Sequence, residues 1–253
     1  MKPLIVANWK INPSTLAEAK RLFNSVAKGI KNIGRTEVVI CPPFLYLPTI
    51  QQSNISTIKL GAQDCFWEEK GAFTGEISPA MLKDLGVDYV IIGHSERRKY
   101  LKETDEKVNK KLRAVLKTGL KAILCVGSIQ RGEKGGREMS RQLEKSLVKV
   151  KKSDLKNIVF TYEPIWAIST TRGSAVATPE NTKDGAIFIK KTLFKLFNKP
   201  PKIKIIYGGS VDSSNIRGFI EGAEMDGVLI GAASLKAEDF IAAVKNIDKL
   251  RKT

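Results

Sequence analysis

Two side chains that can move protons stand directly after apolar segments of the sequence. His94, the only histidine of the chain, comes shortly after Tyr89–Ile92, and Glu163 follows Ile158–Tyr162. Short apolar runs rich in β-branched and aromatic residues predict buried strands. A carboxylate that leaves such a strand into partly apolar surroundings becomes a stronger base, because desolvation disfavours its charge. The pair therefore predicts general acid–base chemistry.

Lys10 completes a set of groups suited to removing a proton next to a carbonyl. That reaction needs a base, an electrophile at the carbonyl oxygen and a cation near the developing enolate, and Glu163, His94 and Lys10 are of these types. The alternatives are structural: a histidine satisfied by hydrogen bonds, and a Glu163 ion pair with Lys10 or Arg97. Ser95 is expected to cap a short helix, whose positive amino end would keep the imidazole neutral.

The elements that must position these groups are short apolar runs separated mostly by segments with helical periodicity. Continuous apolar strands are typical of a parallel sheet that helices cover on both faces. About eight strand–helix repeats within residues 1–253 predict an α/β fold, a single-domain (β/α)8 TIM barrel, and an open doubly wound sheet is the alternative. The expected strands are Leu4–Ala7, Glu37–Cys41, Ile58–Ala62, Tyr89–Ile92, Ala122–Val126, Ile158–Tyr162, Ile203–Tyr207 and Val228–Ile230.

Threonines mark the starts of several expected helices. Thr15 has Glu18 three residues later, as in a capping box, and Thr104 precedes two acidic residues. Thr178 is followed by a proline at the first helical position.

Polar residues or glycines follow most of the expected strands. In βα barrels the catalytic groups stand at the carboxyl ends of the strands, so these positions are the candidate site. The glycines after the last two strands suit a phosphate site built from backbone N–H groups, although glycine here is also ordinary turn chemistry. The residues concerned are Asn8, Lys10, Gln63, His94, Glu163, Gly208, Gly209, Ser210 and Gly231.

The formal net charge of +17 would suit an anionic partner, because phosphate backbones and membrane surfaces bind basic proteins. The lysines are dispersed along helix-like segments without interleaved aromatics, as on a solvated face. No apolar run approaches the roughly 18 residues that a membrane span needs. No specific nucleic acid and no membrane are expected as partners. The lysines are typified by Lys107, Lys110, Lys111, Lys117, Lys145, Lys149, Lys151 and Lys152.

The three cysteines, Cys41, Cys65 and Cys125, are odd in number and follow no metal-ligand spacing. They are expected to be reduced and buried, which favours a cytoplasmic location. The segment Met1–Asn12 lacks the long apolar region of a signal peptide and is expected to hold the first strand.

The loops that follow the strands resemble those of the triosephosphate isomerase family. The match runs from Asn8-Trp9-Lys10 to Gly231-Ala232-Ala233-Ser234-Leu235 and so covers essentially the whole chain. So many matching loops in the same order are specific to a family. The clearest segments between those ends are Gly71-Ala72-Phe73-Thr74-Gly75-Glu76, Gly93-His94-Ser95-Glu96-Arg97-Arg98, Tyr162-Glu163-Pro164-Ile165-Trp166-Ala167-Ile168 and Tyr207-Gly208-Gly209-Ser210-Val211.

The resemblance implies an enzyme of glycolysis and gluconeogenesis that interconverts dihydroxyacetone phosphate and D-glyceraldehyde 3-phosphate through an enediolate, without metal or organic cofactor. It implies Glu163 as the base, neutral His94 as the electrophile, and Lys10, oriented by Asn8, as the cation. Glu96 is implied to support these groups from behind. Backbone N–H groups that would bind the substrate phosphate are implied near Ser169, Ser210, Gly231 and Ala232.

The sequence departs from this resemblance after Trp166, where the family carries a lid that excludes water from the enediolate. The segment Ser169–Ala177 is longer than the usual loop by roughly three residues, and Ser169 replaces a glycine. Ser128 stands where the family has a glutamate that helps to hold the lid's tryptophan. We expect the longer lid segment and the replacement of the glutamate by Ser128 to have arisen together. Ser128→Glu should then alter turnover or the loss of phosphate from the enediolate; no change in either refutes the coupling.

Ala232 is a further departure, because a second glycine is usual there. At positive φ an alanine costs about 1 kcal/mol and shifts the neighbouring amides, whereas at negative φ the replacement is silent.

The segment Asp64–Pro79 is long for a βα loop and rich in aromatic residues. These aromatics either pack on the chain's own barrel or, as the resemblance implies, dock beside a neighbouring active site with Thr74 at the tip. A homodimer through this loop is expected, with Gln63 and Thr74 in supporting roles. The aromatics are Phe66, Trp67 and Phe73.

Two other functions remain as alternatives: another phosphate-binding barrel enzyme, such as a lyase, and a basic barrel that only binds nucleic acid. A Schiff-base lyase needs a buried lysine at a strand end, and Lys10 is the only strong candidate. A protein that only binds has no need of Glu163, His94 and Lys10 on separate strands. Salt-dependent retention on DNA would distinguish it.

Overall fold

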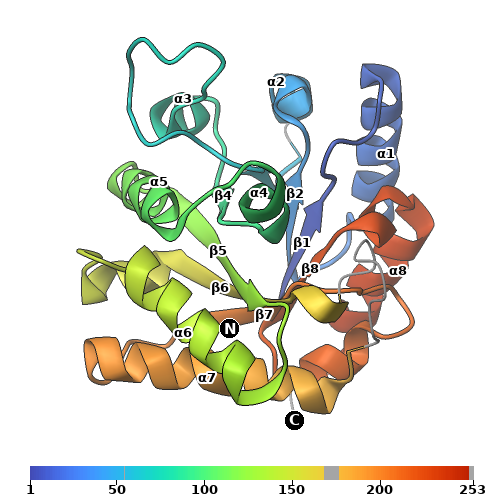
Figure 1. The fold of residues 1–253 in the computed structure, drawn as a ribbon. Helices are drawn as coiled ribbons and strands as arrows, with labels where there is room; N and C mark the ends of the chain where they lie inside the picture. The colour runs from blue at the N-terminus through green and yellow to red at the C-terminus, as the bar shows by residue number, and fades with distance from the viewer. Residues whose placement is uncertain (54, 168–176, 251–253) are drawn as a thin grey trace.

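The computed structural model describes residues 1–53, 55–167 and 177–250. Eight parallel strands form a closed barrel in chain order (Figure 1). The first strand pairs with the last from Leu4↔Gly227 to Ala7↔Ile230, so the open doubly wound sheet is wrong and the barrel is confirmed. The strands are β1 Leu4–Asn8, β2 Glu37–Cys41, β3 Ile58–Ala62, β4 Tyr89–Ile92, β5 Lys121–Ser128, β6 Ile158–Pro164, β7 Lys204–Tyr207 and β8 Gly227–Ile230.

The expected strand bounds agree with the structure to within two residues at every end. The largest differences lie at the carboxyl ends of β5 and β6, which pair as far as Gly127↔Glu163 and Ser128↔Pro164. Glu163 therefore lies within β6, where the sequence had placed it just beyond the strand. Backbone pairing with β5 fixes its main chain on one side.

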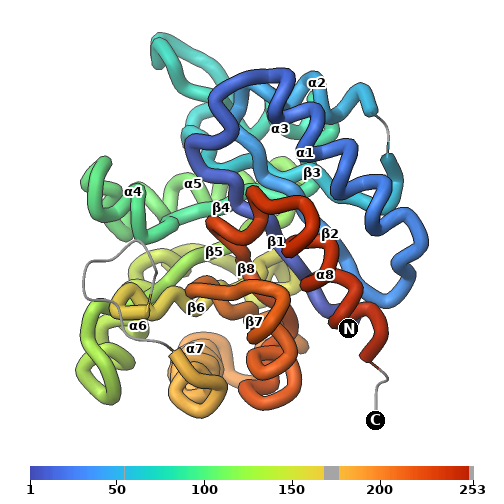
Figure 2. Tube along the Cα trace, turned by 90° about the vertical axis from the view of Figure 1, so that its right-hand side faces the viewer, coloured from blue at the N-terminus to red at the C-terminus, as the bar shows by residue number. Residues whose placement is uncertain are grey.

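Helices surround the barrel, with α1 and α8 beside one another and α5, α6 and α7 following around the ring (Figures 1 and 2). Thr15, Thr104 and Thr178 all cap helices through their side chains, as expected. Only Thr178 forms a complete capping box, with Asn181 as the reciprocal partner. The helices are α1 Leu16–Gly29, α2 Leu47–Gln51, α3 Pro79–Asp84, α4 Ser95–Tyr100, α5 Asp105–Lys117, α6 Gly132–Ser146, α7 Pro179–Phe197 and α8 Ala237–Asp248.

The core has two parts, because side chains alternate across each strand. On β1, Leu4 and Val6 belong to a cluster inside the barrel, whereas Ile5 and Ala7 pack in the layer between strands and helices. Both layers are continuous and apolar. The polar site can therefore form only at the ends of the strands.

The loop from Asp64 to Ser78, between β3 and α3, stands out from the barrel in both views (Figures 1 and 2). Phe66 stacks on Trp67 with ring centroids 4.0 Å apart and contacts Phe73 at 4.7 Å. The aromatics thus pack mainly on one another, and Phe73 remains 43% exposed. Within the described residues, no helix is both long and apolar enough to cross a membrane.

Candidate active site

Glu163 is a buried carboxylate at the carboxyl end of β6, with 2% of its surface exposed. Its Oε2 accepts a hydrogen bond of 2.9 Å from the backbone N–H of Ser95, and its Oε1 lies 3.1 Å from His94 Nε2. A backbone amide and an imidazole, carried by a different strand–helix unit, therefore hold both oxygens.

His94 is the N-cap of α4, and its ring nitrogens have different roles. The backbone N–H of Glu96 donates to Nδ1 at 3.2 Å, so Nδ1 carries no proton in this arrangement. The proton of a neutral ring is then on Nε2, which faces Glu163. The expectation that Ser95 caps this helix is wrong: Ser95 is its first residue, and the imidazole itself occupies the cap.

Lys10 follows β1 in a left-handed backbone conformation, with φ of 54°. Its backbone N–H donates to Asn8 Oδ1 at 3.1 Å, and its carbonyl accepts from Gln63 Nε2 at 2.8 Å. Gln63 also donates to the Cys41 carbonyl at 2.9 Å, which ties the turn to the end of β2. Three strand ends thus hold a strained turn that aims the lysine.

Glu96 links Lys10 to the histidine. The Lys10 ammonium lies 2.6 Å from Glu96 Oε1, and Glu96 Oε2 lies 3.7 Å from His94 Nδ1. The structure therefore brings Asn8, Lys10, His94, Glu96 and Glu163 into one connected cluster, with Gln63 bound to its edge.

The glycine-containing loops after β7 and β8 border this cluster. A Cβ built on Gly208 would lie 3.1 Å from Glu163 Cγ, and one built on Gly231 would lie 3.3 Å from Lys10 Cε. Ser210 Oγ donates to the Ala167 carbonyl at 3.0 Å, so this hydroxyl is engaged with the chain that follows β6. The backbone N–H groups of these loops remain the candidate phosphate ligands.

Ala232 and Ser169 are the two other positions expected to bind phosphate. Ala232 is not among the residues with positive φ, so its departure from glycine carries no backbone strain. Ser169 lies outside the described residues, as does most of the segment Ser169–Ala177.

Thr74 is not brought to the cluster. It is exposed at the turn of the long loop and makes no side-chain hydrogen bond to the site within the described chain. A role for Thr74 in catalysis therefore requires a second copy of the chain.

The amide of Ser95 is the partner of Glu163 that the sequence did not identify. The first N–H groups of a helix have no partner within the helix, so they bind nearby acceptors. A helix start directly after a strand-end histidine was the signal that could have indicated it.

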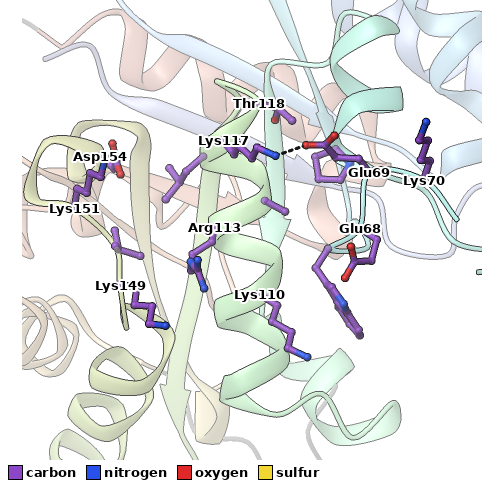
Figure 3. Close-up of a pocket in the computed structure, with 15 residues that line it drawn as sticks. Glu68, Glu69, Lys70, Lys110, Arg113, Lys117, Thr118, Lys149, Lys151 and Asp154 are labelled. Carbon is purple, nitrogen blue, oxygen red and sulfur yellow. Dashed lines mark hydrogen bonds and ion pairs between the residues drawn. The ribbon is translucent and has the colours of Figure 1, made fainter.

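A large groove of about 740 Å3 lies away from this cluster, along α5 (Figure 3). Lys110, Arg113 and Lys117 line it along the helix, and Lys117 pairs with Glu69 at 2.6 Å. The charged side chains of the groove are largely solvated and do not converge on a reacting position. Across the described residues, no group of three or more His, Cys, Asp or Glu side chains is placed to hold a metal ion.

Comparison with known proteins connects this geometry to an activity. A family model described as triosephosphate isomerase matches residues 3–247. Proteins named triosephosphate isomerase from Caldanaerobacter subterraneus subsp. tengcongensis and Carboxydothermus hydrogenoformans are 45% and 43% identical, each alignment covering 96% of this chain and 98% of the relative. The protein of that name from Clostridium tetani is 44% identical, with 96% of each chain covered.

Proposed function

Since the chain belongs to the triosephosphate isomerase family and is an aldose–ketose isomerase, we propose that Glu163, His94 and Lys10 are the residues that interconvert dihydroxyacetone phosphate and D-glyceraldehyde 3-phosphate. The observation that carries this assignment is the convergence of a buried carboxylate, an imidazole and an ammonium from β6, β4 and β1.

Glu163 removes a proton from the carbon next to the substrate carbonyl and returns it to the neighbouring carbon. Its carboxylate is held by Ser95 N–H and His94 Nε2, so it must leave the amide to reach substrate. The side chain of Glu163 is short and its backbone belongs to β6, which limits this movement. Net composition is unchanged, as an isomerisation requires.

His94 and Lys10 stabilise the charge that develops on the substrate oxygens. The Nε2–H of a neutral imidazole donates to the carbonyl oxygen as it gains charge, while the Lys10 ammonium provides a fixed cation. Glu96 and Asn8 act as positioning residues for Lys10.

The phosphate of the substrate binds to backbone N–H groups near Ser210, Gly231 and Ala232, and at Ser169. Support for the Gly231 position is its nearness to Lys10, because a Cβ built on Gly231 would lie 3.3 Å from Lys10 Cε. The segment Ser169–Ala177 is proposed as the lid over that phosphate.

A coupled assay of glyceraldehyde 3-phosphate isomerisation, run on wild type and Glu163→Gln, tests the assignment. Wild type should turn over substrate, and the variant should lose nearly all activity because an amide cannot accept the proton. Arg137→Gln is a control, since Arg137 is exposed and, among the described residues, forms a salt bridge only to Glu133. Equal activity in wild type and Glu163→Gln would overturn the assignment.

The two alternative functions have less support. Lys10 is held by a carboxylate at 2.6 Å, whereas a Schiff-base lyase needs a lysine nitrogen that is free to attack the substrate carbonyl. A barrel that only binds nucleic acid gains nothing from Glu163 buried against His94.

A homodimer through the loop Asp64–Pro79 forms part of the proposal. Its support is the projection of the loop from the barrel and the exposure of Phe73 at 43%. Light scattering at micromolar concentration should give twice the chain mass of 27.9 kDa, and a monomeric mass would contradict it.

A cytoplasmic location is proposed as well. Cys41, Cys65 and Cys125 are all buried and free, and burial raises the pKa of the Cys41 and Cys65 thiols. Three unpaired thiols suit a reducing compartment.

A further inference from the structure

Arg131 stacks its guanidinium on the indole of Trp166, with 4.1 Å between Cζ and the ring centroid. Arg131 lies in the turn between β5 and α6, and Trp166 belongs to the short 3-10 helix Ile165–Ala167 that follows β6. A cation over an indole face at this distance is an attractive contact. The two strand ends next to Glu163 are therefore joined by their side chains as well as by their backbone.

The position of Arg131 is one that helix formation disfavours. It is the N-cap of α6 and makes no side-chain capping hydrogen bond. N-caps favour Ser, Thr, Asp and Asn, and a cation at a helix amino end opposes the helix dipole. A residue that breaks a local rule is expected where it serves another purpose. The stack on Trp166 is the contact that arginine gains there.

Ser128, the last residue of β5, makes its contacts elsewhere. Its Oγ donates to Glu138 at 2.5 Å and accepts from the backbone N–H of Gln130 at 2.8 Å. The Ser128 side chain thus shapes the turn and ties it to α6, and it leaves the indole to Arg131.

Tyr162 interacts with both members of this contact. Burial and the Asp184 carboxylate raise the pKa of Tyr162 to about 12, while interactions with the Trp166 indole and the Arg131 charge oppose the rise. Tyr162, Trp166 and Arg131 thus form one cluster next to Glu163 in sequence and in space.

Glu163 and this cluster are neighbours along the chain. Only Pro164 and Ile165 separate Glu163 from Trp166, and Gly127 and Ser128 pair with Glu163 and Pro164. The end of β6 thus connects the backbone of Glu163 to the stack on Trp166, so a displacement of this strand end would disturb the stack.

We propose that Arg131 is a positioning residue that holds Trp166, and with it the end of β6, in the arrangement where Glu163 is bound to the Ser95 amide. This inference rests on the proposed isomerase activity. Substrate binding then works against the Arg131 contact, so removing the guanidinium should strengthen binding of substrate and transition state equally.

The test compares Arg131→Met, Arg131→Lys and the control Arg137→Met, an exposed arginine of α6 paired with Glu133. In Arg131→Met the KM for glyceraldehyde 3-phosphate should fall about two- to five-fold with kcat unchanged. A change of this size is what the loss of an exposed cation–π contact produces. Arg131→Lys retains a cation and should lie between Arg131→Met and wild type. Arg137→Met should match wild type.

A spectroscopic readout follows the contact without relying on activity. In protein labelled with 5-fluorotryptophan, the 19F signal lost in Trp166→Phe identifies Trp166, one of three tryptophans. That signal should shift in Arg131→Met and stay in place in Arg137→Met.

An unchanged KM in Arg131→Met would overturn the inference whether or not the signal shifts, as would equal effects in both methionine variants. Failure of the proposed function looks different: wild type would show no isomerase activity while the 19F signal still responds to Arg131→Met. In that case the contact stands and its role in the reaction falls.

Discussion

The ammonium of Lys10 owes its position to a single carboxylate. Glu96 lies 2.6 Å from it, and the other hydrogen bonds of Lys10 within the described part of the chain hold its backbone. Charge-assisted hydrogen bonds are roughly twice as strong as neutral ones, so the charge of Glu96 matters as much as its shape.

Glu96→Gln should therefore lower kcat/KM about tenfold, which corresponds to about 1.4 kcal/mol, because the amide holds Lys10 less firmly. Steady-state kinetics in both directions measure this. Glu133→Gln, which removes a carboxylate from an exposed pair with Arg137, is the matched control and should leave kcat/KM unchanged. Identical kinetics in the two variants would show that Glu96 does not position Lys10.

Gly127 is the other residue on which the geometry depends, because β5 has no room there for a side chain beside β6. A Cβ built on Gly127 would lie 1.8 Å from the backbone oxygen of Glu163, so any side chain must push the strands apart.

Gly127→Ala should reduce the free energy of unfolding by about 1–3 kcal/mol and reduce turnover as well, since the strain falls on Glu163, the proposed base. Urea unfolding followed by circular dichroism, with kinetics on the same samples, measures both. Gly34→Ala, where nothing lies within 4 Å of the built Cβ, should change neither. A stable and fully active Gly127→Ala would mean that β5 and β6 adjust freely.

At the scale of elements, α7 begins with a reciprocal cap between Thr178 and Asn181. Thr178 Oγ1 accepts from Asn181 N–H, and Asn181 Oδ1 accepts from Thr178 N–H at 2.9 Å. This reciprocal cap fixes the start of a 19-residue helix that covers β6.

Thr178→Ala should lower the free energy of unfolding by about 1 kcal/mol, because an amide at the helix start loses its partner. Thr178→Ser keeps the hydroxyl and should restore most of the loss. Urea denaturation of the three proteins provides the measurement, and an alanine variant as stable as wild type would argue that the start of α7 is held by its packing alone.

The elements themselves were largely predictable, because apolar runs and threonine caps are local signals. The ends of β5 and β6 were not: Gly127 and Pro164 are poor strand formers, and only pairing between distant segments keeps them in the sheet. The side chains of the candidate site were identified because they lie at or just beyond the carboxyl ends of strands. The Ser95 amide, the Glu138 contact of Ser128 and the Arg131 stack were missed, because each depends on how two loops meet.

At the scale of the whole molecule, closure of the barrel is the feature that local patterns leave open. Repeated strands and helices suit an open sheet as well, and the pairing of β1 with β8 joins the two ends of the chain. On the opposite part of the barrel, the long β3–α3 loop meets α5 around a buried ionic cluster.

In this cluster two carboxylates share two cations. Asp64 contacts Lys111 at 2.7 Å and Arg97 at 2.8 Å, and Glu103 pairs with the same two residues. Burial, and secondarily the Glu103 charge, raises the pKa of Asp64 from 3.8 to about 6, while Lys111 and Arg97 oppose the rise.

The stability of the protein should depend on pH through Asp64. A raised pKa means that the folded chain binds this proton more tightly than the unfolded chain, so the contribution is full below pH 3.8 and is lost as pH rises through about 6. Relative to Asp64→Asn, wild type should lose about 2–3 kcal/mol of unfolding free energy between pH 4 and pH 7. Urea unfolding at both values measures the difference, and parallel pH profiles for the two proteins would contradict it.

The one histidine of the chain also has a practical consequence for spectroscopy. Labelling with 15N-histidine places the isotope in a single imidazole, that of His94, so the spectrum needs no assignment. A neutral ring with its proton on Nε2 has two nitrogens of very different chemical shift, whereas an imidazolium has two similar ones. A titration of substrate analogue into such a sample would follow the electrophile of the reaction in isolation from the other 252 residues.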